Sequence, residues 1–225
     1  MAVPGLFRRI LNAAVEEIGG PDPAMPIGQC RYVVVDTELT GLDIKKDSIV
    51  SIGAVAMTGG RIFLGETFYE MVSPETALRS ESVVVHGIMP SEVADKPLIG
   101  DVINDFIAFC EGAVVVGHFL SIDLSFLNKE LMQHSGRKLR NPAVDTLHIH
   151  EWLRDYGGEF GRHYRGMAHS IELSAMAKKY HIQVSEAHNA LMDAFVTAQL
   201  FQRFLSFLPG LGVRTVKDLL SIGKP

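Results

Sequence analysis

The sequence predicts an α/β domain built around a mixed sheet, and three patterns lead to that fold class. Two strand-like runs, 49–58 and 61–72, flank Gly59-Gly60 and predict an antiparallel hairpin. The apolar run 113–116 predicts a buried central strand. From residue 97 onward, helix-like and strand-like patterns alternate along the chain. Antiparallel strands followed by such alternation are typical of a mixed sheet flanked by helices.

The first thirty residues predict a helix and a linker ahead of the main domain. Apolar residues recur at helical spacing over 5–18, so we expect an amphipathic helix that packs on the domain or on a partner. The segment GGPDPAMPIG (19–28) is rich in glycine and proline and predicts a loop. We therefore divide the chain into an N-terminal part (1–30), a domain (31–207) and a short C-terminal extension (208–225).

The domain opens with an apolar run at 32–35, which predicts its first strand. Apolar residues three and four positions apart over 97–110 predict the first helix after the hairpin. The later elements follow in order: a helix over 122–134, a short strand over 144–146, a helix to about residue 155, a loop over 156–166, and helices over 171–180 and 190–207.

Composition excludes several classes of protein. With 47% hydrophobic residues among 225, the chain can bury a sizeable core, which argues against disorder. No run approaches the roughly 18 apolar residues of a membrane helix, and the N-terminus lacks the pattern of a secretory signal. Two cysteines, Cys30 and Cys110, cannot form a disulfide framework, so we expect a cytoplasmic protein. The net charge of -5 argues at first against a nucleic-acid partner.

Acidic residues interrupt the apolar structure at three places. Asp36 and Glu38 follow the first strand two residues apart, so they share a face; the alternative is a strand end that meets solvent. Asp123 begins the helix after the central strand, where the alternative is an ordinary N-cap. His188 precedes the last long helix, and Asp193 lies among apolar residues on it, where the alternative is a solvated face.

Together these side chains form a plausible metal site. Carboxylate oxygens are the ligands that hard divalent cations such as Mg²⁺ and Mn²⁺ prefer. Two such ions about 3.5–4 Å apart stabilise the attacking and leaving oxygens of a phosphoryl displacement. Ligation to shared cations also explains why acids that repel one another would converge.

The local sequences resemble the histidine-containing branch of the DEDD exonuclease superfamily, which includes the proofreading subunit of bacterial replicative DNA polymerase and oligoribonuclease. The similarity covers about residues 32–205 and rests on three motifs in order, with two intervening segments. They are VVVDTELTGL (33–42), VVVGHFLSIDLSFL (114–127) and HNALMDA (188–194), with VHGI (85–88) and DTL (145–147) between them.

This resemblance implies a ribonuclease H-like fold and a role for each matching residue. It implies two Mg²⁺ or Mn²⁺ ions bound by four acids and a histidine as general base. Leu39 and Phe119 depart from the family pattern; Phe119 is a core residue or a stacking platform for a base. The implied residues are Asp36, Glu38, Asp123 and Asp193 as catalytic metal ligands, His188 as the catalytic base, and Thr40, Val85 and His86 around the terminal nucleotide.

The expected function is that of a 3′–5′ exonuclease that releases nucleoside 5′-monophosphates from single-stranded or frayed DNA 3′ ends, in proofreading or repair. Two alternatives stay open: an exoribonuclease that trims RNA, and a non-catalytic subunit that tethers a DNA polymerase. The four acids account for -4 of the net -5, so the acidic balance is largely the signature of the metal site.

Three further features allow two interpretations each. A basic and aromatic segment, 162–165, contacts the nucleic-acid backbone together with Arg137, Lys138 and Arg140, or is a solvated loop. The tail 208–215 resembles half of a helix-hairpin-helix, and we favour a helix-capping turn. His118 is expected to support the active site from behind rather than to react.

Overall fold

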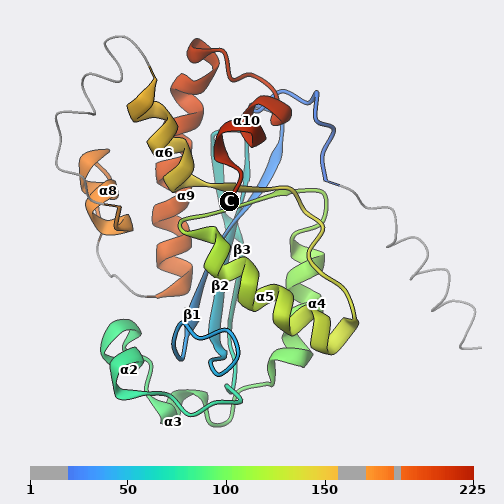
Figure 1. The fold of residues 1–225 in the computed structure, drawn as a ribbon, viewed down its shortest axis with the longest axis vertical. Coiled ribbons are helices and arrows are strands. Elements are labelled where there is room, and N and C mark those ends of the chain that lie inside the picture. The colour runs from blue at the N-terminus through green and yellow to red at the C-terminus, as the bar shows by residue number, and fades with distance from the viewer. Residues whose placement is uncertain (1–19, 157–170, 185–188) are drawn as a thin grey trace, which may run out of the picture.

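The structure, a computed structural model, describes residues 20–156, 171–184 and 189–225 (Figure 1). Its centre is a five-stranded sheet in the order β3-β2-β1-β4-β5. The strands are β1 (Arg31–Leu39), β2 (Ile49–Thr58), β3 (Arg61–Met71), β4 (Val114–Gly117) and β5 (Ala143–Asp145). The first three pair antiparallel, whereas β4 runs parallel to β1, and β5 parallel to β4. The predicted mixed sheet is therefore confirmed.

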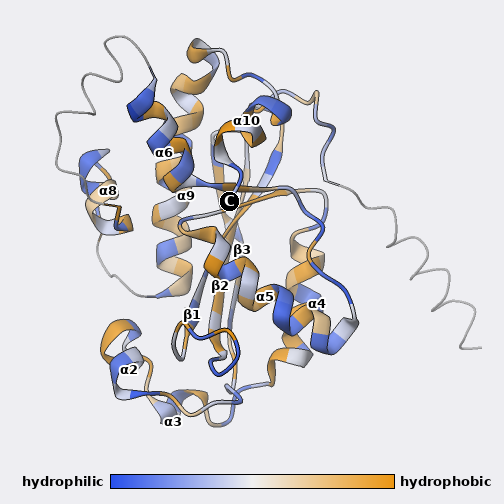
Figure 2. Ribbon diagram, viewed as in Figure 1, coloured by the Kyte–Doolittle hydropathy of each residue, from blue (hydrophilic) through white to orange (hydrophobic). Residues whose placement is uncertain are grey.

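Helices cover both faces of this sheet. Helices α4 and α5 pack on one face and α6, α8, α9 and α10 on the other, so the sheet lies between two apolar layers. Figure 2 shows that α5 and α9 each mix hydrophobic and hydrophilic residues along their length, as expected of helices with one buried side. The helices are α2 (Ser80–His86), α3 (Pro90–Val93), α4 (Ile99–Phe109), α5 (Leu120–Ser135), α6 (Thr146–Asp155), α8 (Leu173–Lys179), α9 (Ala190–Phe207), the 3-10 helix η1 (Leu208–Leu211) and α10 (Val216–Gly223).

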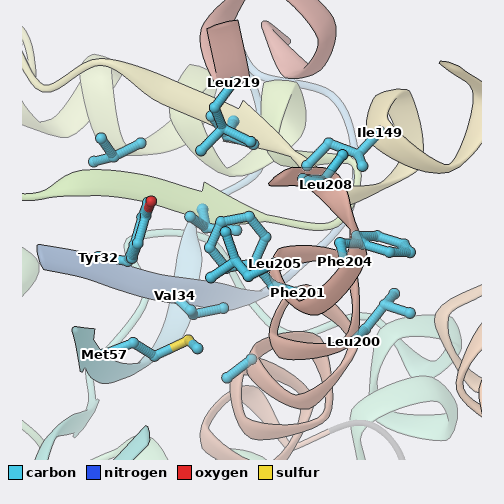
Figure 3. Close-up of a cluster of buried hydrophobic side chains, with 14 of the residues drawn as sticks. Tyr32, Val34, Met57, Ile149, Leu200, Phe201, Phe204, Leu205, Leu208 and Leu219 are labelled. Carbon is cyan, nitrogen blue, oxygen red and sulfur yellow. The ribbon is translucent and has the colours of Figure 1, made fainter. Parts of the chain in front are cut away.

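Alternation along β1 divides the core into its two layers. Tyr32 and Val34 face the α9 side, where the rings of Tyr32 and Phe201 pack edge to face with their centroids 4.9 Å apart (Figure 3). Val33 and Val35 face α4 and α5 instead. Each fully buried large side chain contributes roughly 1.5–3 kcal/mol through the hydrophobic effect. Because both faces are buried, β1 reads as a nearly continuous apolar run.

The hairpin and the last long helix match their predictions closely. Gly59 turns the hairpin with a φ of 51°, and its N–H donates to the carbonyl of Cys30. The 3-10 helix η1 ends at Gly212 with a φ of 92°, which agrees with a capping turn in the tail. Helix α9 has the bounds that the apolar spacing predicts.

Three elements were not predicted, and one strand is longer than expected. Helices α2 and α3 fill the segment between the hairpin and α4. In the tail, α10 begins with a capping box between Thr215 and Asp218, and its Val216 and Leu219 are buried in the α9-side core. Strand β1 runs to Leu39 instead of ending before Asp36.

Some expectations fall outside the residues that the structure describes. The N-terminal helix over 5–18, the basic segment 162–165 and His188 all lie in the undescribed ranges 1–19, 157–170 and 185–188. Among the helices that are described, none is long and apolar enough to cross a membrane.

Candidate active site

Asp36 and Glu38 lie inside β1, not at its end. Asp36 pairs with Gly53 and Glu38 with Ser51 across the antiparallel β1–β2 ladder. The expectation that the strand stops before the acids is therefore wrong, because pairing with β2 extends it past both of them. Residues two apart on a strand share a face, so both carboxylates project from the side of the sheet that α9 covers.

The start of α9 brings Asp193 to the same place. The Asn189 side chain caps the helix by accepting the N–H of Met192 at 3.2 Å, and Asp193 is the fourth helical residue. The helix packs directly on the backbone of β2, because a Cβ on Gly53 would lie 2.2 Å from the carbonyl carbon of Ala190. Gly53 is the β2 partner of Asp36, so this close approach sets Asp193 beside the acids of β1.

Three carboxylates converge as a result. Oxygen atoms of Asp36, Glu38 and Asp193 all lie within 4.8 Å of one another. Across the described parts of the chain, no lysine or arginine forms an ion pair with Asp36, Glu38 or Asp123. Carboxylate oxygens that gather without such a counter-charge are a donor set suited to hard divalent cations.

Asp123 approaches from the other layer, on the first turn of α5. The N-cap position of that helix belongs to Phe119, so the N-cap interpretation of Asp123 is wrong. Its carboxylate is only 6% exposed, and one oxygen accepts two hydrogen bonds from Thr37, from the N–H at 3.0 Å and from the hydroxyl at 2.6 Å. Thr37 stands between the two acids of β1 and therefore ties α5 to them.

We expect the substitution Thr37→Val to lower nuclease activity about tenfold. Valine keeps the shape and the N–H but removes the hydroxyl, and a hydrogen bond to a charged group is worth roughly 1.5–3 kcal/mol. Steady-state kinetics with Mn²⁺ would measure the loss, with Thr67→Val on the exposed face of β3 as the matched control. Equal activity of the two variants would refute the role of this hydroxyl.

The acids share an environment that favours protons. Burial, followed by the charges of Asp123, Glu38 and Asp193, raises the pKa of Asp36 well above its usual range. Burial and the charges of Asp193 and Asp123 raise the pKa of Glu38 from 4.5 to about 8. Burial raises the pKa of Asp123 to about 7, although the Thr37 hydrogen bonds oppose the shift. A bound divalent cation would supply the missing positive charge and displace these protons.

Thermal stability should therefore respond to pH and metal together. Between about pH 5 and 8 Glu38 and Asp123 are ionised in the unfolded chain but still carry protons in the folded one. Because the folded state binds more protons, the free energy of unfolding of the metal-free protein falls as pH rises. Mn²⁺ should raise the melting temperature more at pH 8 than at pH 5.5, because at pH 8 fewer protons compete with it. Unfolding scans in EDTA and in Mn²⁺ would measure this, and a metal-induced shift that does not change with pH would contradict it.

A strained turn precedes Asp123. Phe119 has a φ of 55°, in the left-handed region that large residues rarely adopt. Buried Asp145 holds the turn by accepting the N–H groups of Phe119 at 3.2 Å and Leu120 at 2.9 Å, and it also caps α6 through Leu147. Strain of this kind persists where the surroundings over-determine it. In the sequence, Asp145 is an acid at the junction of a predicted strand and a predicted helix. Its hydrogen bonds to the start of α5 could not be predicted, because they join segments far apart in the chain.

One cleft flanks the acids on the α2 side. It has a volume of about 380 Å³ and is mainly apolar, with Leu42 and Val85 exposed on its walls. His86 is buried, and its Nδ1 accepts the N–H of Ile88 at 3.0 Å. Thr40 also lines this cleft, but its hydroxyl is used internally. It donates to Asp47 and accepts the N–H of Ser48.

An ion pair stabilises the wall of the cleft on the α2 side. Arg79, immediately before α2, contacts the fully buried Asp47 at 2.9 Å. Asp47 also accepts the N–H of Asp43, so it joins the loop after β1 to the start of α2. Sequence reasoning missed both residues, because neither lies in a motif and the pairing is long-range.

A second cleft, of about 450 Å³, lies on the α8 side of the acids. Its lining includes Asp36, Asp193, Phe119 and His118. The His118 ring lies 2.9 Å from the Thr146 hydroxyl through Nδ1 and 2.7 Å from the carbonyl of residue 171 through Nε2. Burial lowers the pKa of His118, which favours the neutral form of its ring. His188 itself lies outside the described residues, directly before Asn189.

Comparison with known proteins agrees with this geometry. The sequence model of the family RNase_T, described as exonuclease, matches residues 33–201. The DNA polymerase III subunit epsilon of Aquifex aeolicus is 30% identical over 177 residues, which are 79% of this chain and 81% of that protein. A DNA polymerase III subunit epsilon-like protein of Rhodobacter capsulatus is 35% identical over 87% of this chain. The chain spans 27% of that protein and 13% of a PolC-type DNA polymerase III of Caldanaerobacter subterraneus.

Solved structures share the fold. Exonuclease I of E. coli in complex with a dT13 oligonucleotide superimposes with a TM-score of 0.67 at 18% identity, covering 82% of this chain and 43% of that one. Exonuclease X in complex with 5′ overhanging duplex DNA superimposes with a TM-score of 0.64 at 23% identity, covering 85% of this chain and 98% of that one. The sheet and its helices thus have the predicted ribonuclease H-like arrangement.

Proposed function

Because the chain belongs to the RNase_T exonuclease family, we propose that it is a metal-dependent 3′–5′ exonuclease acting on single-stranded or frayed DNA 3′ ends. The observation that carries the proposal is the convergence of the Asp36, Glu38 and Asp193 carboxylates, with Asp123 tied to the same strand through Thr37. The relatives named as DNA polymerase III subunits support DNA as the polymer.

In this proposal Asp36, Glu38, Asp123 and Asp193 hold two Mg²⁺ or Mn²⁺ ions. Such ions, when bound, supply positive charge to the attacking and leaving oxygens of a phosphoryl displacement. The protein contributes rigid placement: β1 fixes two acids, the cap at Asn189 fixes the start of α9, and Thr37 orients Asp123.

His188 accepts a proton from the attacking water. The water oxygen forms a bond to the phosphorus of the last phosphodiester as the bond from that phosphorus to the 3′ oxygen of the preceding nucleotide breaks. The 3′ oxygen takes up a proton from solvent to become the new 3′-hydroxyl, and a nucleoside 5′-monophosphate leaves. An imidazole with an unperturbed pKa near 6.5 is suited to this exchange near neutral pH. This role comes from the family motif around His188.

The cleft on the α2 side takes the terminal nucleoside. Its apolar walls at Leu42 and Val85 suit the faces of a base, and it opens beside Glu38. His86 lines the same cleft, and Thr40 holds the loop that forms its edge. A single-stranded or frayed end has an unpaired base that can enter such a cleft, whereas a paired end does not.

A digestion panel tests the proposal. Purified protein with Mn²⁺ would receive 5′-labelled single-stranded DNA, duplex DNA with a mismatched 3′ end, and single-stranded RNA of the same sequence. We expect ladders shortened from the 3′ end, nucleoside 5′-monophosphates as products, faster cleavage of DNA than of RNA, and no cleavage in EDTA. Faster cleavage of RNA would identify an exoribonuclease, and metal binding without cleavage would point to a tethering subunit.

The histidine is tested separately. We expect His188→Ala to lower kcat at least a hundredfold, since general-base catalysis contributes about 10²–10⁴. His181→Asn is the control, because His181 is exposed in the turn after α8 and its φ of 58° is one that asparagine tolerates. Wild-type activity in His188→Ala would refute its assignment.

A further inference from the structure

A basic cleft lies at the opposite end of α5 from Asp123. It has a volume of about 460 Å³, between the outer side of α4 and the loop 136–141 that joins α5 to β5. The loop contributes Arg137, Lys138 and Arg140, and α4 and the turn after it contribute mainly small or neutral residues and one acid, Glu111. Arg137 and Lys138 against Glu111 leave a local excess of positive charge on a chain of net charge -5.

The loop that carries these cations is firmly held. Gly136 ends α5 in the left-handed conformation, with a φ of 64°. The Asn128 side chain on α5 accepts the N–H of Leu139 at 2.8 Å. At the other end, the Asn141 side chain donates to the carbonyls of Cys110 and Ala113 at 2.7 and 2.8 Å. The cations therefore project from a fixed backbone, which lowers the entropy lost when they bind an anion.

Helix α5 connects this cleft to the acids. Asp123 lies in its first turn, and the helix then runs to the side of α4 (Figure 1). Gly136, which follows the last residue of α5, lines the basic cleft. A groove along the exposed face of α5 is lined by Leu124 and Ser125, the two residues that follow Asp123, by Lys129, and at its far end by Lys138 of the basic loop. Lys129 lies part of the way along, where it forms an ion pair with Glu130 at 3.2 Å and donates to the carbonyl of Asp47 at 2.9 Å.

The distance suits a short length of nucleic acid. The helix rises 1.5 Å per residue, so the twelve steps from Asp123 to Ser135 span roughly 18 Å. At about 3.4 Å per stacked nucleotide, roughly five nucleotides cover that distance. A strand whose terminal nucleotide lies at the acids would thus bring phosphates about five positions upstream to the basic cleft.

We propose that the cleft formed by Arg137, Lys138 and Arg140 binds the backbone phosphates of the substrate strand about five nucleotides upstream of its 3′ end. The inference rests on the proposed function and adds a second contact to it. Phosphates are bound by arginine and lysine without regard to base sequence, so the cleft raises affinity for longer strands and leaves specificity unchanged. A trinucleotide is too short to reach it.

The test compares substrate lengths in one charge-reversed variant. The length ratio is kcat/KM on a dT12 strand divided by kcat/KM on a dT3 strand. For Arg137→Glu/Lys138→Glu we expect this ratio to fall at least tenfold from its wild-type value, because KM for dT12 rises. A plot of the logarithm of the dT12 binding constant against the logarithm of the salt concentration should become shallower by roughly 1.4. Each phosphate contact to a single strand contributes about 0.7 to that slope, and the variant loses two contacts. Lys217→Glu/Lys224→Glu makes the same change in charge at two exposed residues, one on α10 and one directly after it, and should keep the wild-type ratio.

The outcomes separate the two proposals. No cleavage of either strand by the wild-type protein would overturn the proposed function. Cleavage with an unchanged length ratio in the Arg137→Glu/Lys138→Glu variant would overturn the basic cleft alone. The same result together with lost binding of a poly-glutamate peptide would assign the cleft to an acidic protein partner and likewise overturn the proposal. Thermal unfolding of each variant establishes that it is folded.

Discussion

Asp36→Asn should abolish nuclease activity and at the same time stabilise the metal-free protein. We expect activity with Mn²⁺ to fall about a thousandfold, because an amide binds a divalent cation poorly and the transition state loses several kcal/mol of charge stabilisation. In EDTA at pH 8.5 we expect the melting temperature to rise by roughly 2–4 °C, the effect of about 1 kcal/mol in a protein of this size.

The expected rise in melting temperature follows from the burial and mutual repulsion of the acids. At pH 8.5 Glu38 and Asp123, with pKa values of about 8 and 7, are mainly ionised, and both lie close to the Asp36 carboxylate. Burial and these charges raise the pKa of the Asp36 carboxyl, so that group destabilises the folded protein at pH 8.5, and the uncharged amide of asparagine removes this cost. Asp105→Asn on the exposed side of α4 is the control and should change neither quantity. A fall in melting temperature in Asp36→Asn, or retained activity, would contradict this description of the site.

Gly53→Val should lower activity at least a hundredfold without touching an acid. A side chain at Gly53 collides with backbone atoms of Ala190 and Leu191, so the start of α9 must move away from β2 and carry Asp193 with it. A displacement of about 1 Å in a catalytic group can cost a factor of 10². Kinetics and Mn²⁺ titration would both show the loss, and Gly53→Ala should show a smaller one.

Gly65→Val is the matched control for that experiment. Gly65 also lies in a strand, on β3, but a Cβ there meets nothing within 4 Å. We expect this variant to keep wild-type activity and metal affinity. Equal loss in Gly53→Val and Gly65→Val would mean that substitution of a strand glycine, not displacement of α9, causes the defect.

The sequence was sufficient for elements whose own pattern is strong. Helix α9 was predicted at its observed bounds, because apolar residues recur at helical spacing over its eighteen residues. The hairpin was equally clear from its two strand-like runs and the glycines between them. The acids were noticed because each interrupts an apolar segment.

Other features depend on contacts between distant segments. Helix α2 presents Val84 and Val85 to solvent, so its sequence lacks an amphipathic period that would predict it. Asp and Glu are rare in strands, and only the pairing of β1 with β2 carries the strand through Asp36 and Glu38. The roles of Gly53 and Asp145 follow from what packs against them, which a single sequence does not reveal.

The acids come from three places along the chain, on β1, α5 and α9, at positions 36, 123 and 193. During synthesis the first two are complete long before the last one emerges, and α9 must also dock on β2 at Gly53 before its acid is in place. A growing chain therefore has no finished catalytic centre until nearly all of the domain has left the ribosome.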